Sequence, residues 1–198
     1  MAETIDVALG AVQRDVVVLV DEAGAVLGSA GKIAAHEPPG QLHLAISVVL
    51  YRLDGLLILQ QRAATKYHFP LFWANACCSH PRPGELPAVA AEARVEEELG
   101  VACALRPAGS FLYRATCPTT GLVEYELDHV FVGELDLSPR PDPNEVAAVA
   151  FVAPTELFDG SFAGPSAPWL VPAVRLAEQL RSVDEAAKSR RRSDQPSI

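Results

Sequence analysis

The sequence lacks two features that would direct the protein to a membrane or a secretory pathway. No apolar run reaches the ~20 residues that a membrane-spanning helix needs. The first ten residues, MAETIDVALG, carry acidic side chains where a signal peptide would carry basic ones. We therefore expect a cytoplasmic protein with no membrane partner.

Positive charge is also scarce. The chain has 16 Lys and Arg residues against 25 Asp and Glu residues, so its net charge is −9. An acidic surface repels nucleic acids and anionic lipids, and we expect no nucleic-acid partner. An anionic substrate would therefore need positive charge that is concentrated in a pocket.

Cysteine is rare, and two of the four cysteines, Cys77 and Cys78, are adjacent. In a reducing cytosol we expect thiols, and adjacent cysteines seldom reach the geometry of a disulfide with each other. These two lie in the run WANACCSHP, which also contains His80. The run by itself leaves three interpretations open: a metal knuckle, half of a disulfide, or a nucleophile beside its base.

The chain also lacks internal repeats and linkers, and its 198 residues suit one domain. We expect an N-terminal extension over 1–14, a single domain over 15–183 and a polar tail over 184–198. Proline-rich segments over 31–43 and 68–84 are predicted to be loops. Strand-like runs surround one central helix and precede a terminal helix. This order predicts an α+β or α/β/α sandwich around a mixed sheet, not a regular βαβ array.

The predicted central helix ends in EEELGV, where Gly100 is placed as a C-terminal cap. This ending resembles the Nudix box, in which glutamates hold a divalent metal against a diphosphate. Successive helical residues differ by 100°, so at most one of Glu97 and Glu98 points at a given ion. A solvated acidic face is the alternative. The Arg-Glu pair of the hydrolase box is replaced by Ala93 and Arg94, which argues against phosphoanhydride hydrolysis.

A second set of possible metal ligands is spread along the chain. Glu124 and Glu126 lie two apart in a predicted strand, so both point to one face. Two carboxylates on one face repel each other unless a cation or a proton separates them. With His36, His43 and His80 they would form a plausible octahedral set for Mn²⁺, Mg²⁺ or Zn²⁺. Spacing alone leaves open that each is an ordinary surface or core residue.

Several segments together resemble type I isopentenyl diphosphate isomerase: AAHEPPGQLHLA, QRAATKYHFPLFWANACCSHP, EEELG, YRATCPTTGLVEYE and a late PW. They follow the family's order from about residue 16 to about residue 180. The resemblance implies a Nudix-like α/β/α sandwich that converts isopentenyl diphosphate to dimethylallyl diphosphate through a tertiary carbocation. It implies a small-molecule substrate, and we expect a monomer. A Nudix hydrolase of a nucleoside diphosphate derivative is the alternative.

The resemblance also implies roles for single residues. Cys78 and Glu126 match the catalytic pair, Tyr113 matches the tyrosine that hydrogen-bonds the glutamate, and Trp169 matches the tryptophan that faces the cation. Glu98 matches the ligand of a substrate-bridging Mg²⁺. The ligands of a tightly held divalent metal, Mn²⁺ or Mg²⁺ with Zn²⁺ as the third candidate, are His36, His43, His80, Glu124 and Glu126. The diphosphate would bind to Lys32, Arg62, Lys66 and Arg94.

Two histidines, His68 and His129, match no functional position of the family. We therefore expect both of them to be structural.

Overall fold

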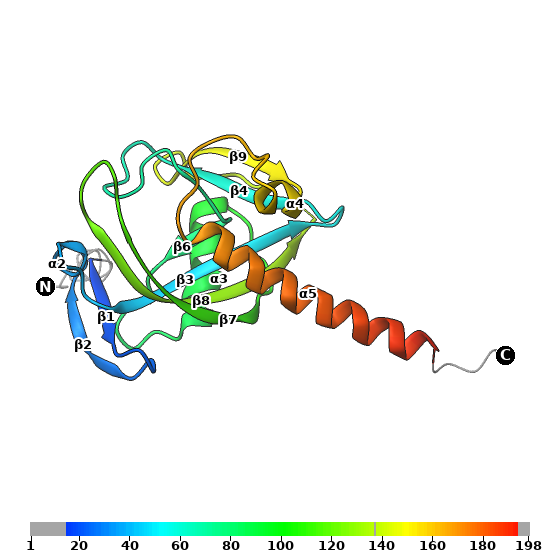
Figure 1. Cartoon of the computed structure of the whole chain (residues 1–198), viewed down its shortest axis with the longest axis horizontal. Helices are drawn as coiled ribbons and strands as arrows, with labels where there is room; N and C mark the ends of the chain where they lie inside the picture. Colours follow the sequence, from blue (N-terminus) through cyan, green and yellow to red (C-terminus); the bar gives the residue numbers. More distant parts are fainter. Residues whose placement is uncertain (1–14, 137, 194–198) are drawn as a thin grey trace, which may run out of the picture.

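The computed structural model of the protein describes residues 15–136 and 138–193. In this part of the chain a mixed sheet of nine strands lies between helices (Figure 1). The strands are β1 (Val16–Val20), β2 (Val26–Gly31), β3 (His43–Arg52), β4 (Leu57–Arg62), β5 (Trp73–Ala74), β6 (Cys77–Ser79), β7 (Arg106–Thr116), β8 (Val123–Leu135) and β9 (Val146–Val152). The helices are α2 (Lys32–His36), α3 (Pro87–Leu99), α4 (Pro154–Phe158) and α5 (Leu170–Ser193).

Strand β3 is central to the sheet. It pairs in parallel with β8, from His43 beside Glu126 to Arg52 beside Leu135. The short strand β6 pairs antiparallel with β3, and β7 pairs antiparallel with β8. Because side chains alternate along a strand, this ladder determines which residues of β3 and β8 share a face.

The two faces of the sheet have separate apolar cores. On one face Ile46 and Leu50 of β3 pack with Val95 of α3. On the other face Val49 of β3 packs with Val174 of α5. The predicted α/β/α sandwich with a mixed sheet is therefore confirmed.

The face under α5 changes character along β3 and β8. Its apolar part lies toward the carboxyl ends of the two strands and includes Val49, Tyr51, Val130 and Val132. Toward the amino ends the same face carries polar side chains that are nevertheless buried: His43, Ser47, Glu124, Glu126 and Asp128. Burial of so many ionisable groups is costly unless they are paired, so this end of the sheet is a candidate functional site.

Helix α3 has the boundaries that its sequence predicts. Pro87 occupies the first turn, where its missing N–H is tolerated. Gly100 ends the helix with φ of 65°, and its N–H bonds the Glu96 carbonyl at 2.9 Å. A side chain at position 100 would also come within 2.8 Å of the Arg140 carbonyl, so both conformation and space favour glycine there.

Three segments differ from expectation. The predicted loop over 31–43 contains α2, whose five residues are too few to show a helical period. The predicted loop over 68–84 contains β5 and β6, which have two and three residues. Helix α5 continues through 184–193, where we expected a polar tail, and it projects beyond the sheet (Figure 1). Asp184 is fixed to Arg106 of β7 at 2.6 Å, and the alanines that follow favour a helix.

The predicted N-terminal extension over 1–14 and the end of the predicted tail over 194–198 lie outside the described residues. Across 15–136 and 138–193, no helix is both long enough and apolar enough to cross a membrane.

Candidate active site

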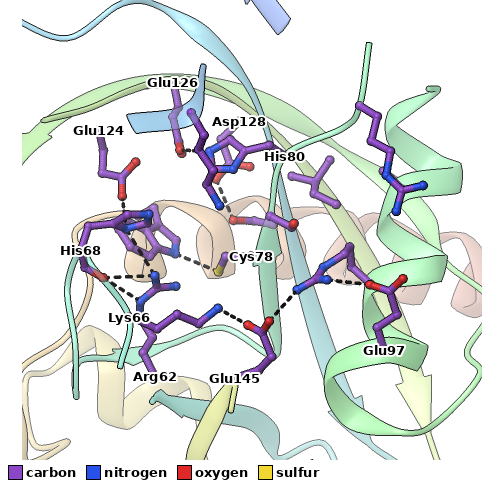
Figure 2. A pocket seen from close by; sticks show the side chains of 18 of the residues that line it. Arg62, Lys66, His68, Cys78, His80, Glu97, Glu124, Glu126, Asp128 and Glu145 are labelled. Carbon is purple, nitrogen blue, oxygen red and sulfur yellow. Dashed lines mark hydrogen bonds and ion pairs between the residues drawn. The ribbon is translucent and has the colours of Figure 1, made fainter. Parts of the chain in front are cut away.

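A cavity of about 250 Å³ opens at the polar end of β3 and β8. Of the residues predicted from the sequence, it is lined by Lys32, Arg62, Lys66, Cys78, His80, Arg94, Tyr113, Glu124, Glu126 and Trp169. The other three predicted residues, His36, His43 and Glu98, are buried next to this lining and at most 2 % exposed. In Figure 2 the acidic side chains of β8 lie on one side and Lys66 and Glu145 on the other, with Cys78 between them.

Five of the predicted residues form one cluster at the acidic end. His36, His43, His80, Glu124 and Glu126 each offer a ligand atom, and these atoms all lie within 4.8 Å of one another. Separate elements supply them: α2, the first residue of β3, the segment after β6, and β8. The sheet register therefore assembles residues that lie far apart in sequence.

Backbone contacts orient two of these imidazoles. His36 donates from Nδ1 to the Lys32 carbonyl at 2.6 Å, and His43 donates from Nδ1 to the Gln41 carbonyl at 2.8 Å. In the neutral ring, Nε2 is then a lone-pair acceptor. The Nε2 of His36 nevertheless lies 3.0 Å from Glu124 Oε2, and that of His43 lies 3.2 Å from His80 Nε2. Acceptors that face each other so closely require a proton or a cation between them.

The chemistry of this donor set fits a divalent metal. Imidazole nitrogens and carboxylate oxygens suit first-row divalent ions and Mg²⁺, and a histidine ligand commonly donates its second N–H to a carbonyl. Burial lowers the pKa of His80 well below its usual value, so this ring is neutral. Burial opposes ionisation of Glu124, but His68 and His36 hold its pKa well below its usual value. His80 thus offers a neutral ring and Glu124 an ionised carboxylate.

Cys78 reaches the cavity from β6. Its Sγ accepts a hydrogen bond from Trp169 Nε1–H at 3.0 Å and donates one to Asn75 Oδ1 at 3.0 Å. Burial, the largest cause, raises the pKa of Cys78 well above its usual value, so the group is a thiol. The neighbouring Cys77 is fully buried on the α3 side of the sheet. All four cysteines are free thiols, so Cys78 is not half of a disulfide within this chain.

Glu126 reaches the cavity from β8. Tyr113, its register partner on β7, donates from its hydroxyl to Glu126 Oε2 at 2.5 Å. His80 Nε2 lies 2.9 Å from Glu126 Oε1. Burial and the charge of Glu124 oppose ionisation of Glu126, but His43 and His80 keep its pKa below the usual value.

Trp169 closes one wall of the cavity and is 3 % exposed. The Phe69 ring forms a T-shaped pair with it at a centroid distance of 5.3 Å, and the Tyr113 ring lies at 5.9 Å. The Arg62 guanidinium lies 5.6 Å from the ring centroid. The indole is therefore held rigidly, with its N–H directed at Cys78.

The opposite end of the cavity is basic. Arg62 donates to the His68 carbonyl through Nε at 3.3 Å and Nη2 at 3.1 Å. Lys66 forms an ion pair with Glu145, and Arg94 lies 3.5 Å from the same carboxylate. Burial, followed by the charge of Lys66, lowers the pKa of Lys32 to about 8. The local positive charge that an acidic protein would need for an anionic substrate is present here.

The two acids at the end of α3 differ in burial, although both contact the same arginine. Glu97 lines the cavity. Glu98 is buried, forms an ion pair with Arg94 at 2.5 Å and accepts a hydrogen bond from Gln60 at 3.3 Å. Arg94 also pairs with Glu97 at 2.6 Å, so it joins both acids.

His68 is a site residue that the sequence did not reveal. Its ring stacks on His36 at 5.1 Å and 14°, and its Nδ1 lies 2.5 Å from Glu124 Oε1. It lines the cavity, so the expectation that it has only a structural position is corrected. No spacing rule predicts this contact, because the irregular segment after β4 determines it. His129, by contrast, lies outside the cavity lining.

Asp128 is a second residue that was missed. It lines the cavity, is 1 % exposed and accepts a hydrogen bond from Ser47 Oγ at 2.7 Å. Burial and the charge of Glu126 raise the pKa of Asp128 well above its usual value. The alternation that pairs Glu124 with Glu126 would have found it, because Asp128 is the next position on the same face.

Comparison with known proteins gives one consistent result. A family model described as NUDIX domain matches residues 41–172. The chain is 50 % identical over 162 residues to an isopentenyl-diphosphate Delta-isomerase of Nocardia farcinica, covering 81 % of this chain and 93 % of the relative. It is 48 % identical over 160 residues to the protein of that name from Streptomyces coelicolor, covering 80 % and 81 %.

Solved structures show the same fold. DR0079 from Deinococcus radiodurans superposes with a TM-score of 0.66 at 24 % identity, covering 81 % of this chain and 97 % of that one. RenU, a Nudix hydrolase from M. smegmatis, superposes with a TM-score of 0.52 at 18 % identity, covering 84 % and 95 %. At these identities the likeness concerns the fold alone.

Proposed function

This chain belongs to the isopentenyl-diphosphate Delta-isomerase family of Nudix-domain proteins, and we propose that Cys78 and Glu126 carry out its reaction. The enzyme isomerises isopentenyl diphosphate to dimethylallyl diphosphate. The single observation that supports the assignment of residues is that the Cys78 thiol and the Glu126 carboxylate enter the same cavity from β6 and β8, which pair with opposite edges of β3.

The rearrangement adds a proton to one alkene carbon and removes a proton from another, so the double bond moves along the five-carbon chain. An alkene is a poor base, and the acid must be held against it in a site that excludes water. Cys78 and Glu126 provide two proton-carrying groups. The thiol holds its proton in the resting enzyme, and the carboxylate accepts the Tyr113 hydroxyl proton in a hydrogen bond.

Trp169 is suited to stabilise the carbocation. An indole face can stabilise a desolvated cation by about 2 kcal/mol or more. The ring is buried in the cavity wall and fixed by Phe69 and Tyr113, so little reorganisation is needed when the charge develops.

The basic end would bind the diphosphate. Arg side chains offer a fork of donors and Lys side chains a point charge, and both suit phosphate oxygens. The binding residues are Lys32, Arg62, Lys66 and Arg94. Glu98 would hold the Mg²⁺ that accompanies the diphosphate. In the structure Glu98 is paired with Arg94, and the diphosphate would compete with Glu98 for that arginine.

A divalent cation would be held by His36, His43, His80, Glu124 and Glu126. Among Mn²⁺, Mg²⁺ and Zn²⁺, the mixed nitrogen and oxygen ligands favour Mn²⁺ or Zn²⁺ over Mg²⁺. When bound, the ion supplies positive charge that holds both carboxylates together and lowers the proton affinity of Glu126.

We also propose that the enzyme acts as a monomer, because the residues of one chain complete the cavity. Its net charge of −9 disfavours a nucleic-acid partner or an anionic membrane.

The test is incubation of the purified protein with isopentenyl diphosphate and Mg²⁺ in heavy water. We expect dimethylallyl diphosphate that carries deuterium, because one proton of the product comes from exchangeable groups of the enzyme. Cys78→Ala, purified in the same way, is the matched control, because any labelled product that it gives would come from contaminating isomerase of the expression host. Absence of labelled product, together with hydrolysis of ADP-ribose at ordinary enzymatic rates, would instead establish a Nudix hydrolase.

A further inference from the structure

Asn75 lies between β5 and β6 and is 1 % exposed. Its Nδ2 donates to two backbone carbonyls, that of Val48 at 3.0 Å and that of Cys77 at 2.8 Å. Both carbonyls can only accept. The amide must therefore present its nitrogen to them and its oxygen to the other side.

That oxygen faces the thiol of Cys78. Oδ1 lies 3.0 Å from Sγ, and a carbonyl oxygen can only accept, so the S–H must be the donor. On another side of the sulfur, Trp169 Nε1–H is a donor at 3.0 Å. The sulfur thus has one donor and one acceptor around it, and its proton has one preferred direction.

We propose that Asn75 is a positioning residue that fixes both the side-chain conformation of Cys78 and the direction of its S–H. This inference rests on the proposed role of Cys78. Asn75 itself does not touch the substrate; it acts through the sulfur. Without these contacts, the thiol would rotate freely. Its proton would then sample several directions, and its sulfur would sample several side-chain conformations.

The consequence concerns proton transfer geometry. Transfer to or from a carbon requires the sulfur to lie close to that carbon with its reacting orbital aligned, and a misplacement of about 1 Å can cost about a hundredfold in rate. The Asn75 amide is itself fixed by its hydrogen bond to the Val48 carbonyl of β3. Strand β3 lies between β6, which carries Cys78, and β8, which carries Glu126. One rigid strand would therefore set the placement of both reacting groups.

A purely structural role is the competing explanation. The two bonds from Nδ2 would tie the turn before β6 to β3 whether or not Oδ1 contacts the thiol. The test must therefore report on the S–H itself.

Infrared spectroscopy provides that measurement, because an S–H stretching band moves to lower frequency when the thiol donates a hydrogen bond. The band of Cys78 is obtained by subtracting the spectrum of Cys78→Ala from that of the wild type. We expect a band at the lower frequency of a donating thiol in the wild type. For Asn75→Ala, the Cys78 band is obtained by subtracting the spectrum of the Asn75→Ala/Cys78→Ala double variant. We expect this band at the frequency of a thiol that donates no hydrogen bond.

The matched control is the neighbouring thiol. The band of Cys77, obtained in the same way with Cys77→Ala, should be unaffected by Asn75→Ala, since Asn75 bonds the Cys77 carbonyl and not its sulfur. A Cys78 band at the unbonded frequency in the wild type would overturn the proposal. That measurement needs no Asn75 variant, so it decides the question even if Asn75→Ala does not fold.

Kinetics give a second readout. For Asn75→Ala we expect kcat to fall by about ten- to a hundredfold while KM for isopentenyl diphosphate stays within about twofold, because the basic end of the cavity is unchanged. An unchanged kcat would contradict the positioning role. The infrared result requires neither substrate nor activity. A wild type without isomerase activity would therefore refute the proposed function, and an unbonded Cys78 band would refute only this inference.

Discussion

Cys78 and Glu126 face one cavity from β6 and β8, two strands that pair with opposite edges of β3. Cys78 is the register partner of Ser47, and Glu126 is the register partner of His43. A substrate in this cavity would lie between a thiol and a carboxylate whose relative placement depends on hydrogen bonds of the sheet and not on flexible loops.

Replacing Cys78 by Ala should lower turnover by several orders of magnitude, since general acid–base catalysis alone contributes about 10²–10⁴-fold. Isomerase assays on the purified variant would measure the effect. Cys77→Ala is the control, because Cys77 is buried in the core on the α3 side. A large loss of kcat in Cys77→Ala would mean that the wrong thiol has been assigned.

Glu126→Gln should also abolish most of the activity, because the amide can neither take up nor release the proton. Tyr113→Phe should cause a smaller loss, about ten- to a hundredfold in kcat, since it removes a hydrogen bond to a charged group worth about 1.5–3 kcal/mol. The phenyl ring keeps the packing on Trp169. Equal losses in the two variants would contradict this division of roles.

The metal site predicts a divalent ion that copurifies with the active protein and is removed by a strong chelator. His36→Ala should lose this ion, because its Nε2 points at Glu124 within the cluster. His129→Ala is the matched histidine control and should retain it, since His129 belongs to another face of β8. Elemental analysis of both variants is the measurement. Active wild-type protein without a bound divalent ion would remove the site.

Lys66→Gln should raise KM for isopentenyl diphosphate and the inhibition constant for inorganic diphosphate, each by about ten- to a hundredfold. This is the value of one lost hydrogen bond to a charged group, about 1.5–3 kcal/mol. The kcat at saturation should change far less, because Lys66 lies at the basic end of the cavity, away from the β8 acids (Figure 2). A loss confined to kcat would contradict a role in diphosphate binding.

Glu145 predicts an acid-sensitive contribution to stability. Burial opposes its ionisation, but Lys66 and Arg94 lower its pKa below the usual 4.5. A depressed carboxyl pKa contributes stability that is fully present above 4.5 and is lost as pH falls through the lower folded-state value. The Tm of Glu145→Gln should therefore lie below that of the wild type at pH 7, and the gap should narrow as pH falls below about 4.

The control for that experiment is Glu92→Gln, at an exposed position of α3. The Tm of Glu92→Gln should equal that of the wild type at pH 7 and also below about pH 4. A gap for Glu145→Gln that stays constant down to acid pH would show that its effect does not come from the ion pairs.

The sequence predicted those parts of the fold and site that repeat with a local period. The α3 boundaries followed from Pro87 and Gly100, and the shared face of Glu124 and Glu126 followed from strand alternation. The clustering of the histidines with the carboxylates did not follow from spacing, since His36 and His80 join Glu124 and Glu126 only through tertiary structure. Resemblance to a family supplied what the spacing left open.

Other features could not be predicted for physical reasons. Helix α2 is too short to show a period, so the element that carries His36 looked like a loop. The contact of His68 with Glu124 depends on an irregular segment. The orientation of the Asn75 amide depends on carbonyls whose positions no side-chain pattern encodes.

The parallel ladder of β3 and β8 has a consequence for errors in folding. A shift of one residue would turn every β8 side chain to the opposite layer, replacing Glu124 and Glu126 in the cavity by Tyr125 and Leu127. It would also turn Val130 and Val132 away from the core beneath α5, with a loss of apolar packing. A misaligned molecule would therefore be both unstable and inert, so the same strand pairing that stabilises the enzyme also excludes a folded form with altered chemistry.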